Sequence, residues 1–349
     1  MAISISTVDL FCGAGGLTYR FEQAGLPVKA GYDIDPACKF PYEHNNKAKF
    51  LLQDVQNVSG LDLAEHFSGS SVKVLAGCAP CQPFSSYSRR YNDRQSKWKL
   101  LQDFARLIEE CEPDIISMEN VLQLKLHSVF QEFIAHLKKL NYCFEYYEVN
   151  CLDYGIPQSR KRLVLFASIF GKINLIAPTH NPDTYQTVRQ TIENLEPLSA
   201  GQASPIDHLH RSSKLSALNL RRIRASKPGG TWRDWPQDLM AKCHIKKSGK
   251  TYPAVYGRME WDKPSPTITT QCFGFGNGRF GHPEQDRAIS LREAALLQTF
   301  PPTYQFVAPD EPVLFSLVGR LIGNAVPVKL GQVIAHSILN HIDLIKESL

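Results

Sequence analysis

The stretch Ile3-Ser-Ile-Ser-Thr-Val-Asp-Leu-Phe-Cys-Gly-Ala-Gly-Gly-Leu17 opens the chain with a β-rich run that leads into a glycine-rich turn. Residues 3–11 are typical of a buried strand, and residues 16–24 have the spacing of a helix. The glycines allow a tight turn and let a ligand approach the backbone closely. The spacing is not GxGxxG, and no GxxxxGK[ST] occurs anywhere in the chain, so a P-loop is excluded.

The same alternation of strands and helices continues through the first half of the chain. Continuous apolar runs ended by polar residues are typical of buried parallel strands, and segments with helical spacing lie between them. The sequence therefore predicts an α/β fold with a doubly wound parallel sheet. The further strands expected are residues 28–33, 72–77, 114–118 and 162–168, and the helices between strands are residues 99–110 and 129–140.

The texture of the sequence changes after about residue 170, where prolines begin to interrupt any long element. Near the end the pattern becomes helical again, and residues 327–347 predict a closing helix. We expect residues 1–170 and 286–349 to form one domain. The closing helix should pack beside the first strand of that domain. A smaller domain of residues 171–285 would be inserted into it.

Composition excludes several classes of protein. The 349 residues are 43% hydrophobic and 21% charged, which is ordinary for a globular protein with at least one full core. A disordered chain, a collagen-like repeat and a small disulfide scaffold are ruled out. No apolar run approaches the ~20 residues of a membrane span, and the N-terminal residues do not resemble a secretory signal. The nine cysteines are expected to be reduced thiols, and the cytoplasm is the default compartment.

The net charge of +5 is unevenly distributed. Residues 211–250 carry eleven Lys and Arg against two Asp, a net charge of +9, so the rest of the chain sums to −4. A basic block on a slightly acidic body suggests a region that binds a polyanion. The alternative, a solvated lysine-rich face, is equally consistent with charge alone.

The glycine-rich turn is followed by two acidic residues at places where a ligand could be bound. Asp33 ends the second predicted strand, where a carboxylate can bind a pair of ribose hydroxyls. Asp54 follows the next apolar run. The turn and these acids suggest an adenosine-containing cofactor, and the alternative is a purely structural turn between a strand and a helix.

The stretch GCAPCQPFS, residues 77–85, follows another buried strand. A helix that begins here would direct its N–H groups at a cysteine and lower the pKa of the thiol. Cys78 and Cys81 also form a CxxC pair. A zinc site is rejected, because no second CxxC or HxxxH exists, whereas a redox-active pair stays open.

Two further motifs carry charged side chains. Glu119-Asn-Val ends the strand predicted at 114–118, so its carboxylate would face the same crevice as Cys81, unless it only complements a helix N-terminus. In Gln158-Ser-Arg-Lys-Arg162, the two arginines alternate and would point to one face of a strand. There they could bind a carboxylate, a base oxygen or a phosphate, or simply form a basic surface.

Together and in this order, these motifs resemble those of the DNA (cytosine-5) methyltransferases over most of the chain. DLFCGAGG resembles the family's cofactor loop, APCQPFS its catalytic Pro-Cys loop, and ENV and QSRKR its next two catalytic motifs. SLREAALLQTFP, residues 290–301, resembles the motif that supports the recognition domain, and IGNAVP, residues 322–327, resembles the last motif. Where this chain has Cys78 and Ala79, the family more often has Gly or Phe and Pro. The CxxC spacing adds the hypothesis that oxidation joins Cys78 to Cys81 and switches the enzyme off reversibly.

The resemblance implies a sequence-specific enzyme of the bacterial modification type. It would transfer a methyl group from S-adenosylmethionine to C5 of a flipped-out cytosine, with S-adenosylhomocysteine as the product and no metal. Cys81 would attack C6 and make C5 enamine-like. Glu119 would hydrogen-bond N3 and the exocyclic amine, while Arg160 and Arg162 would hold Glu119 and contact the base O2 or the substrate backbone. A base, assisted by water, would remove the C5 proton, and Cys81 would leave by β-elimination.

The resemblance also assigns a cofactor site. Phe11 would pack on the adenine, Asp33 would hold the ribose hydroxyls and Asp54 the adenine amino group. Pro80 would shape the floor between cofactor and base. The cofactor-binding residues implied are Phe11, Gly13, Gly15, Gly16, Asp33, Ile34, Asp54, Val55, Pro80 and Asn324.

DNA binding is expected from two regions. Residues 86–99, which are rich in basic and aromatic side chains, are expected to form a loop that closes over the DNA. Residues 171–285 become the target recognition domain, in which Trp232 and residues 273–279 are candidates for reading bases. The DNA-binding residues expected are Ser85, Arg89, Arg90, Arg233 and Arg279.

Three other functions are less consistent with the sequence. A non-catalytic homologue would be expected to have lost a catalytic residue, and a nicotinamide-dependent oxidoreductase leaves the Pro-Cys, ENV and QSRKR motifs unexplained. A tRNA cytosine methyltransferase is disfavoured by the separate basic module, although composition does not exclude RNA. The partners expected are double-stranded DNA and a cognate restriction endonuclease that acts independently, with no membrane. We expect a monomer in the bacterial cytoplasm, associated with the nucleoid.

Overall fold

The computed structural model describes residues 3–80, 94–246, 249 and 252–346. The chain divides into two compact units. The first unit comprises Met1–Tyr154, Lys161–Thr179 and Val326–Leu349, and the second comprises Gly155–Arg160 and His180–Ala325. The borders of these units at residues 180 and 326 differ from the domain borders expected from the sequence, residues 171 and 286.

A seven-stranded sheet forms the centre of the first unit, with the strand order β3-β2-β1-β4-β5-β7-β6. The strands from β3 to β5 are parallel, whereas β7 is antiparallel to both of its neighbours. The bounds are β1 (Ile5–Leu10), β2 (Val28–Asp33), β3 (Lys49–Leu52), β4 (Val72–Gly77), β5 (Ile115–Asn120), β6 (Cys143–Asn150) and β7 (Lys161–Ser168).

The α/β class and the doubly wound sheet predicted from the sequence are confirmed, and the expected parallel pairing holds from β3 to β5 but not at β7. Only residues 151–160 connect β6 to β7, and they contain one short 3-10 turn. A parallel neighbour needs a crossover of about a dozen residues or more, so β7 returns antiparallel and inserts between β5 and β6.

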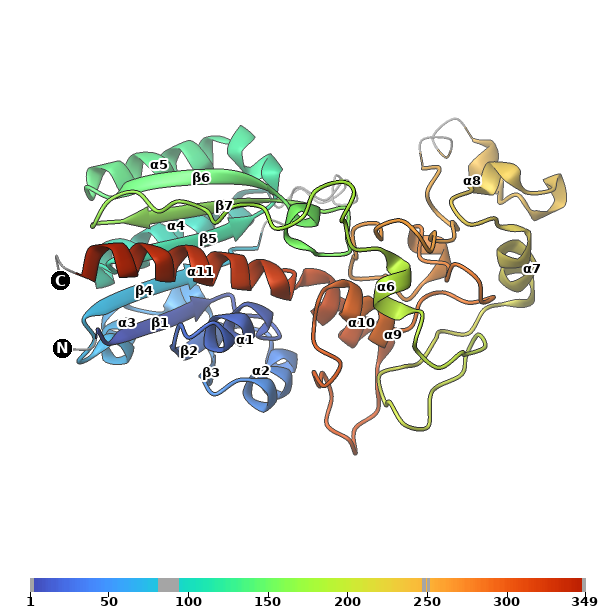
Figure 1. Ribbon diagram of the computed structural model, residues 1–349, viewed down its shortest axis with the longest axis horizontal. Coiled ribbons are helices and arrows are strands. Elements are labelled where there is room, and N and C mark those ends of the chain that lie inside the picture. Colours follow the sequence, from blue (N-terminus) through green and yellow to red (C-terminus); the bar gives the residue numbers. More distant parts are fainter. Residues whose placement is uncertain (1–2, 81–93, 247–248, 250–251, 347–349) are drawn as a thin grey trace. The chain divides into compact units, whose positions relative to one another are not determined.

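Helices cover both faces of the sheet (Figure 1). On one face, α1 (Gly16–Gln23) packs against α11 (Val328–Ile345), the predicted closing helix. On the other face, α3 (Gly60–Phe67), α4 (Arg94–Cys111) and α5 (Ser128–Lys139) bury their apolar sides against the strands. A short helix, α2 (Lys39–Asn45), precedes β3.

The second unit is built from short helices and irregular segments. Its helices are α6 (Val188–Ile192), α7 (Ala217–Ala225), α8 (Lys242–Ile245), α9 (Leu291–Leu297) and α10 (Phe315–Asn324). Within the described residues of this unit, β-pairing is limited to isolated bridges such as Ala203 with Arg211. One aromatic core there gathers Trp232, Trp235 and Phe275 around Ile223.

Glu293 is the centre of a buried ionic cluster in the second unit. It caps α9, because Ser290 N donates to Glu293 Oε2 at 2.6 Å and Ser290 Oγ accepts from Glu293 N. Arg287 donates to both carboxylate oxygens at 2.7 Å, and both side chains are almost completely buried. Burial alone would raise the pKa of Glu293, but hydrogen bonds and charge from Arg287 hold it below the usual value.

We expect Glu293→Ala to destabilise the second unit by about 3–5 kcal/mol, because it leaves the buried Arg287 guanidinium without its ionic partner. Three of the four tryptophans lie in the second unit, so urea unfolding followed by tryptophan fluorescence measures this loss. The control is Asp238→Ala, which removes an exposed ion pair with Arg221 and should change stability by less than about 0.5 kcal/mol. Equal urea concentrations at the midpoint of unfolding for the two variants would contradict the prediction.

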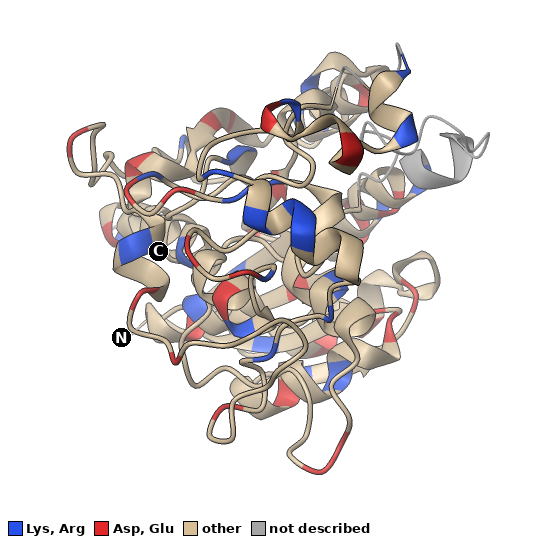
Figure 2. Ribbon diagram, turned by 90° about the vertical axis from the view of Figure 1, so that its right-hand side faces the viewer, with Lys and Arg blue, Asp and Glu red and all other residues tan. Residues whose placement is uncertain are grey.

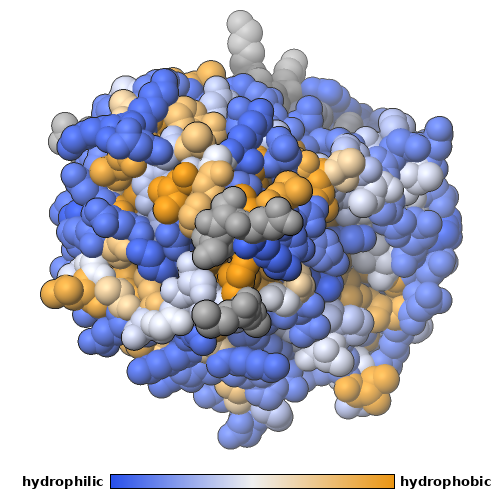
Figure 3. All heavy atoms as spheres, turned by 60° about the vertical axis from the view of Figure 1, so that its left-hand side comes forward, coloured by the Kyte–Doolittle hydropathy of each residue, from blue (hydrophilic) through white to orange (hydrophobic). Residues whose placement is uncertain are grey.

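Figure 3 shows hydrophobic residues in scattered areas between hydrophilic ones on the face in view. No helix within the described residues is long and apolar enough to cross a membrane.

Candidate active site

The glycine-rich loop is held against the end of β2. Gly13 N donates to Asp33 Oδ2, and Asp35 N donates to the other carboxylate oxygen, each at 2.9 Å. Gly13 has a φ of +54°, which strongly favours glycine, and a Cβ atom at this position would have no neighbour within 4 Å. The loop backbone is therefore open to a ligand beside an acidic side chain.

Apolar side chains flank this loop. Ile34 is 66% exposed and Leu52 is 55% exposed, which is unusual for large aliphatic residues at strand ends, and Phe11 is only partly buried. Asp54 follows β3 and accepts from Gln56 N at 3.0 Å. Val55 differs, since its side chain is 2% exposed and belongs to the core, so that any contact with a ligand would have to come from its backbone.

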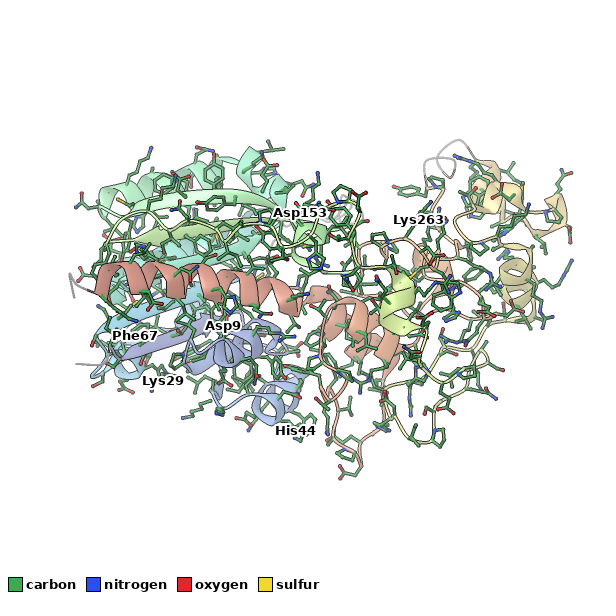
Figure 4. All side chains as sticks on the ribbon, in the orientation of Figure 1. Asp9, Lys29, His44, Phe67, Asp153 and Lys263 are labelled. Atoms are coloured by element: carbon green, nitrogen blue, oxygen red, sulfur yellow. The ribbon has the colours of Figure 1, made fainter. Side chains whose placement is uncertain are left out.

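Asp9 lies on β1 and contacts α1 through Thr18, in the part of the first unit labelled in Figure 4. Its Oδ2 accepts from Thr18 Oγ1 at 2.8 Å, and this hydroxyl lies 3.1 Å from the Tyr42 hydroxyl. Gly31 leaves space for the Tyr42 side chain, because a Cβ atom at residue 31 would lie 2.3 Å from the Tyr42 hydroxyl oxygen. Burial, and to a smaller extent the charge of Asp33, raise the pKa of Asp9 to about 7.

Because the pKa of Asp9 is raised in the folded chain, the free energy of unfolding should decrease between about pH 4 and pH 7. The folded chain keeps a proton that the unfolded chain releases near 3.8, so the stability contributed by protonated Asp9 is lost as pH rises to about 7. The wild type should lose this stability between pH 5 and pH 8, whereas Asp9→Asn should not. The melting temperature of the variant minus that of the wild type should therefore be several degrees higher at pH 8 than at pH 5. The control, Asp343→Asn in α11, replaces an exposed carboxylate and should show no such change. A constant difference for Asp9→Asn would contradict the prediction.

At the end of β5, Glu119 forms two side-chain contacts. Arg162 Nε, from β7, lies 2.9 Å from Glu119 Oε1, and the Cys78 thiol donates to Glu119 Oε2 at 2.9 Å. Glu119 is 3% exposed. The next residue, Asn120, donates from Nδ2 to the carbonyl of Ala79 at 3.1 Å. Two side chains of β5 thus hold the segment that leads into the Pro-Cys motif, and Arg162 of β7 holds one of them, Glu119.

Arg160 does not share a strand face with Arg162, which corrects the expectation from their alternation. Strand β7 begins at Lys161, and Arg160 belongs to the second unit. Its guanidinium donates to Gln158 Oε1 and to the carbonyls of Ile268 and Ala325. The side chain is buried by these backbone contacts, which hold distant segments of the second unit together.

Several expected residues lie outside the described part of the chain. These are Cys81, Ser85, Arg89 and Arg90, together with most of the loop expected at 86–99, whose last residues belong to α4. The hypothesis of a bond between Cys78 and Cys81 therefore has no structural test here. Pro80, the last described residue before this gap, is exposed.

Two arginines of the basic block in the second unit form ion pairs with acidic residues. Arg221 pairs with Asp238, and Arg224 pairs with Asp286. In Figure 2, acidic and basic positions are interspersed over the side in view. These two arginines are therefore balanced locally, and the binding of a polyanion by the block as a whole stays a prediction.

The three candidates for contacting DNA in the second unit lie in different environments. Trp232 is 4% exposed and its Nε1 donates to the carbonyl of Tyr252, so it is a core residue and is not available to read bases. Arg279 donates to the carbonyls of Gly230 and Arg258 and supports these loops. Arg233 is exposed, with its guanidinium 5.4 Å from the centre of the Trp232 ring.

Asn324 ends α10 in the second unit. Its neighbour Gly323 packs directly on the backbone at Thr269 and Thr270, where a Cβ would lie 2.3 Å from the nearest atoms. A glycine is thus required at this point of the IGNAVP motif.

Three residues make contacts between motifs that were not predicted from the sequence. Cys78 and Asn120 hold or contact the catalytic segments, and Gln158 bridges two motifs by donating to Gln298 Oε1 at 2.8 Å. Each stands inside a motif that the sequence had already singled out, but the contacts depend on which segments meet in space.

A family model described as C-5 cytosine-specific DNA methylase matches residues 5–340. The chain belongs to this family. It is therefore a DNA (cytosine-5)-methyltransferase, whose methyl donor is S-adenosylmethionine and whose substrate is DNA. The resemblance inferred from the motifs is confirmed.

Curated relatives match almost the whole chain. The Type II methylase M.HgiDII of Herpetosiphon aurantiacus is 53% identical over 98% of this chain and 97% of its own length. The Type II methyltransferase M1.HphI of Haemophilus parahaemolyticus is 30% identical over 97% of this chain and 87% of its own length.

Solved structures share the fold. A putative DNA modification methyltransferase encoded within a prophage of E. coli has a TM-score of 0.73 at 20% identity and covers 97% of this chain and 100% of its own. A DNMT2 mutant of Spodoptera frugiperda has a TM-score of 0.63 at 17% identity, covering 96% of this chain and 100% of its own.

Proposed function

We propose that this enzyme methylates cytosine in a specific duplex sequence through a covalent bond between Cys81 and C6 of a flipped-out base. The observation that supports this most strongly is the buried Glu119 carboxylate at the end of β5, paired with Arg162 and contacted by the residue three positions before Cys81. A carboxylate held in this way is suited to stabilise charge on a pyrimidine ring.

Cys81 acts as the nucleophile in this proposal. Its thiolate forms a bond to C6, and the electron pair of the C5–C6 double bond makes C5 nucleophilic. Glu119 hydrogen-bonds N3 and the exocyclic amine, and Arg162 orients the Glu119 side chain through their ion pair. After methylation a water-assisted base takes the proton from C5, and the electrons of that C–H bond expel Cys81 by β-elimination. Arg160 contributes from a distance, by holding the segment that precedes Arg162.

The residues around the glycine-rich loop fit S-adenosylmethionine, which supplies the methyl group. Asp33 is suited to the ribose hydroxyls, while Ile34 and Phe11 offer apolar surface for the adenine. Asp54 would accept from the adenine amino group. Gly13, Gly15, Gly16, Val55, Pro80 and Asn324 would complete the contacts through backbone or side-chain atoms. No metal is proposed; within the described residues, no cluster of His, Cys, Asp and Glu could hold one.

The second unit is proposed to recognise the DNA target. Arg233 is the strongest candidate for a DNA contact, because it is exposed beside the aromatic core that would hold it. Ser85, Arg89 and Arg90 remain candidates for phosphate contacts. Arg279 is proposed to support the loops rather than to read bases, because its guanidinium already donates to two backbone carbonyls.

We propose a bacterial modification enzyme that acts as a monomer in the cytoplasm at the nucleoid. The Type II names of the relatives support a cognate restriction endonuclease that acts independently on the same sequence.

The test is incubation with labelled S-adenosylmethionine and unmethylated genomic DNA, followed by bisulfite sequencing. Label at C5 of one cytosine within a short repeated motif is expected. Label spread over all cytosines would contradict sequence specificity. In a parallel incubation with tRNA, label on the tRNA together with none on the DNA would contradict duplex DNA as the substrate.

A further inference from the structure

The Glu119 carboxylate is held from two neighbouring strands. Arg162 reaches Oε1 from β7, and Cys78, which directly follows β4, reaches Oε2. Cys78 is itself anchored, because its backbone N–H donates to the carbonyl of Leu10 at 3.3 Å. The thiol therefore approaches Glu119 from a fixed point at the carboxyl end of the sheet.

The two oxygens of Glu119 differ in what remains available to a substrate. Oε1 is buried and accepts no hydrogen bond within the described part of the chain, although Arg162 Nε lies 2.9 Å away as an ion pair. Oε2 accepts the thiol of Cys78. Each ionised carboxylate oxygen has about two acceptor positions, so Oε1 keeps positions free for the donors of a bound base.

A carboxylate anchored at one oxygen can still turn, because the terminal torsion of glutamate is broad and roughly two-fold. A thiol is ordinarily a weak donor, but a hydrogen bond to an ionised acceptor is considerably stronger than one between neutral groups. A second anchor at Oε2 therefore fixes the carboxylate plane and determines which oxygen faces the substrate.

We propose that Cys78 is a positioning residue, whose thiol fixes the rotation of the Glu119 carboxylate so that Oε1 is presented to the cytosine. This inference rests on the proposed role of Glu119. Cys78 is one of the residues that depart from the family pattern, and the proposed role needs only its reduced thiol. It also makes Cys78 act only through Glu119.

The first test compares single-turnover methylation rates of Cys78→Ala and Cys78→Ser. Loss of a hydrogen bond to a charged group predicts a rate roughly 10–100-fold lower for Cys78→Ala, with KM for DNA nearly unchanged. Serine retains a donor and should restore the rate to within a few-fold of the wild type. The matched control is Cys143→Ala, an exposed cysteine on β6, which should be fully active. Equal rates for Cys78→Ala and the wild type, or for Cys78→Ala and Cys78→Ser, would overturn the proposal.

A double-mutant cycle tests whether Cys78 acts through Glu119. In a Glu119→Gln background, Cys78→Ala should lower the remaining rate less than twofold. Full additivity of the two losses would mean that Cys78 acts elsewhere, which overturns the proposal.

Infrared spectroscopy provides a readout that does not depend on activity. A thiol bound to a carboxylate should give an S–H stretching band at lower frequency than the other thiols, absent in Cys78→Ser and shifted in Glu119→Gln. Absence of this band would refute the hydrogen bond itself. If the band is present but Glu119→Gln methylates normally, the proposed role of Glu119 fails, and the positioning role of Cys78 fails with it.

Discussion

Replacement of Cys81 by alanine is expected to lower the single-turnover rate of methylation by at least about 10⁴-fold. Without a nucleophile, C5 of cytosine stays unactivated, and losing the nucleophile of a covalent enzyme removes most of the catalysis. Binding of S-adenosylmethionine, measured by calorimetry, should be unchanged within about twofold, because the residues proposed for the cofactor lie mainly around the glycine-rich loop.

The matched control for this variant is again Cys143→Ala, which removes a thiol of the first unit far along the chain from the motif. It should retain the wild-type rate. Retention of more than a few per cent of activity in Cys81→Ala would contradict the covalent mechanism, since no second nucleophile is proposed.

Replacement of Glu119 by glutamine is expected to lower the same rate about 10³-fold, within the range typical of a lost charged or proton-transferring group. The amide keeps the shape of the side chain but not its charge, and it leaves Arg162, only 13% exposed, without its ionic partner. The loss should appear in kcat rather than in KM for DNA, because the charge that Glu119 stabilises develops during the reaction.

The control for Glu119→Gln is Glu148→Gln. Glu148 lies on β6 and forms a half-exposed ion pair with Lys125, so the same chemical change on another strand of the same sheet should leave kcat unchanged. A loss of equal size in both variants would mean that sheet stability, rather than catalysis, is affected.

The positions of Cys78 and Glu119 were accessible from sequence because parallel strands bring their carboxyl ends to the same edge of a sheet. Runs of buried residues ended by polar ones located β4 and β5, and the motifs directly follow or end these strands. The thiol–carboxylate contact was not accessible, because it depends on the side-chain directions of two residues 41 positions apart.

Arg160 illustrates why alternation alone was insufficient. Its spacing from Arg162 fits a strand, but the strand begins one residue later. The partners of its guanidinium at Ile268 and Ala325 lie more than a hundred residues away and are backbone carbonyls, which leave no trace in a side-chain pattern.

Charge counting had a related weakness in the second unit. The sum over residues 211–250 includes Arg224, whose acidic partner Asp286 lies outside that window. Trp232 was misjudged for a similar reason, because an aromatic residue in a basic segment can be either a surface or a core residue, and here it packs on His244.

The central claim, a covalent bond from Cys81 to cytosine, is tested most directly with a DNA duplex that carries 5-fluorocytosine at the methylated position. Fluorine at C5 cannot leave as a proton does, so β-elimination is blocked and the enzyme should stay attached. Mass spectrometry after protease and nuclease digestion is expected to find the methylated fluoropyrimidine on the peptide that contains Cys81. Methylation of ordinary cytosine by the same preparation, with no adduct or with an adduct on another residue, would contradict this account.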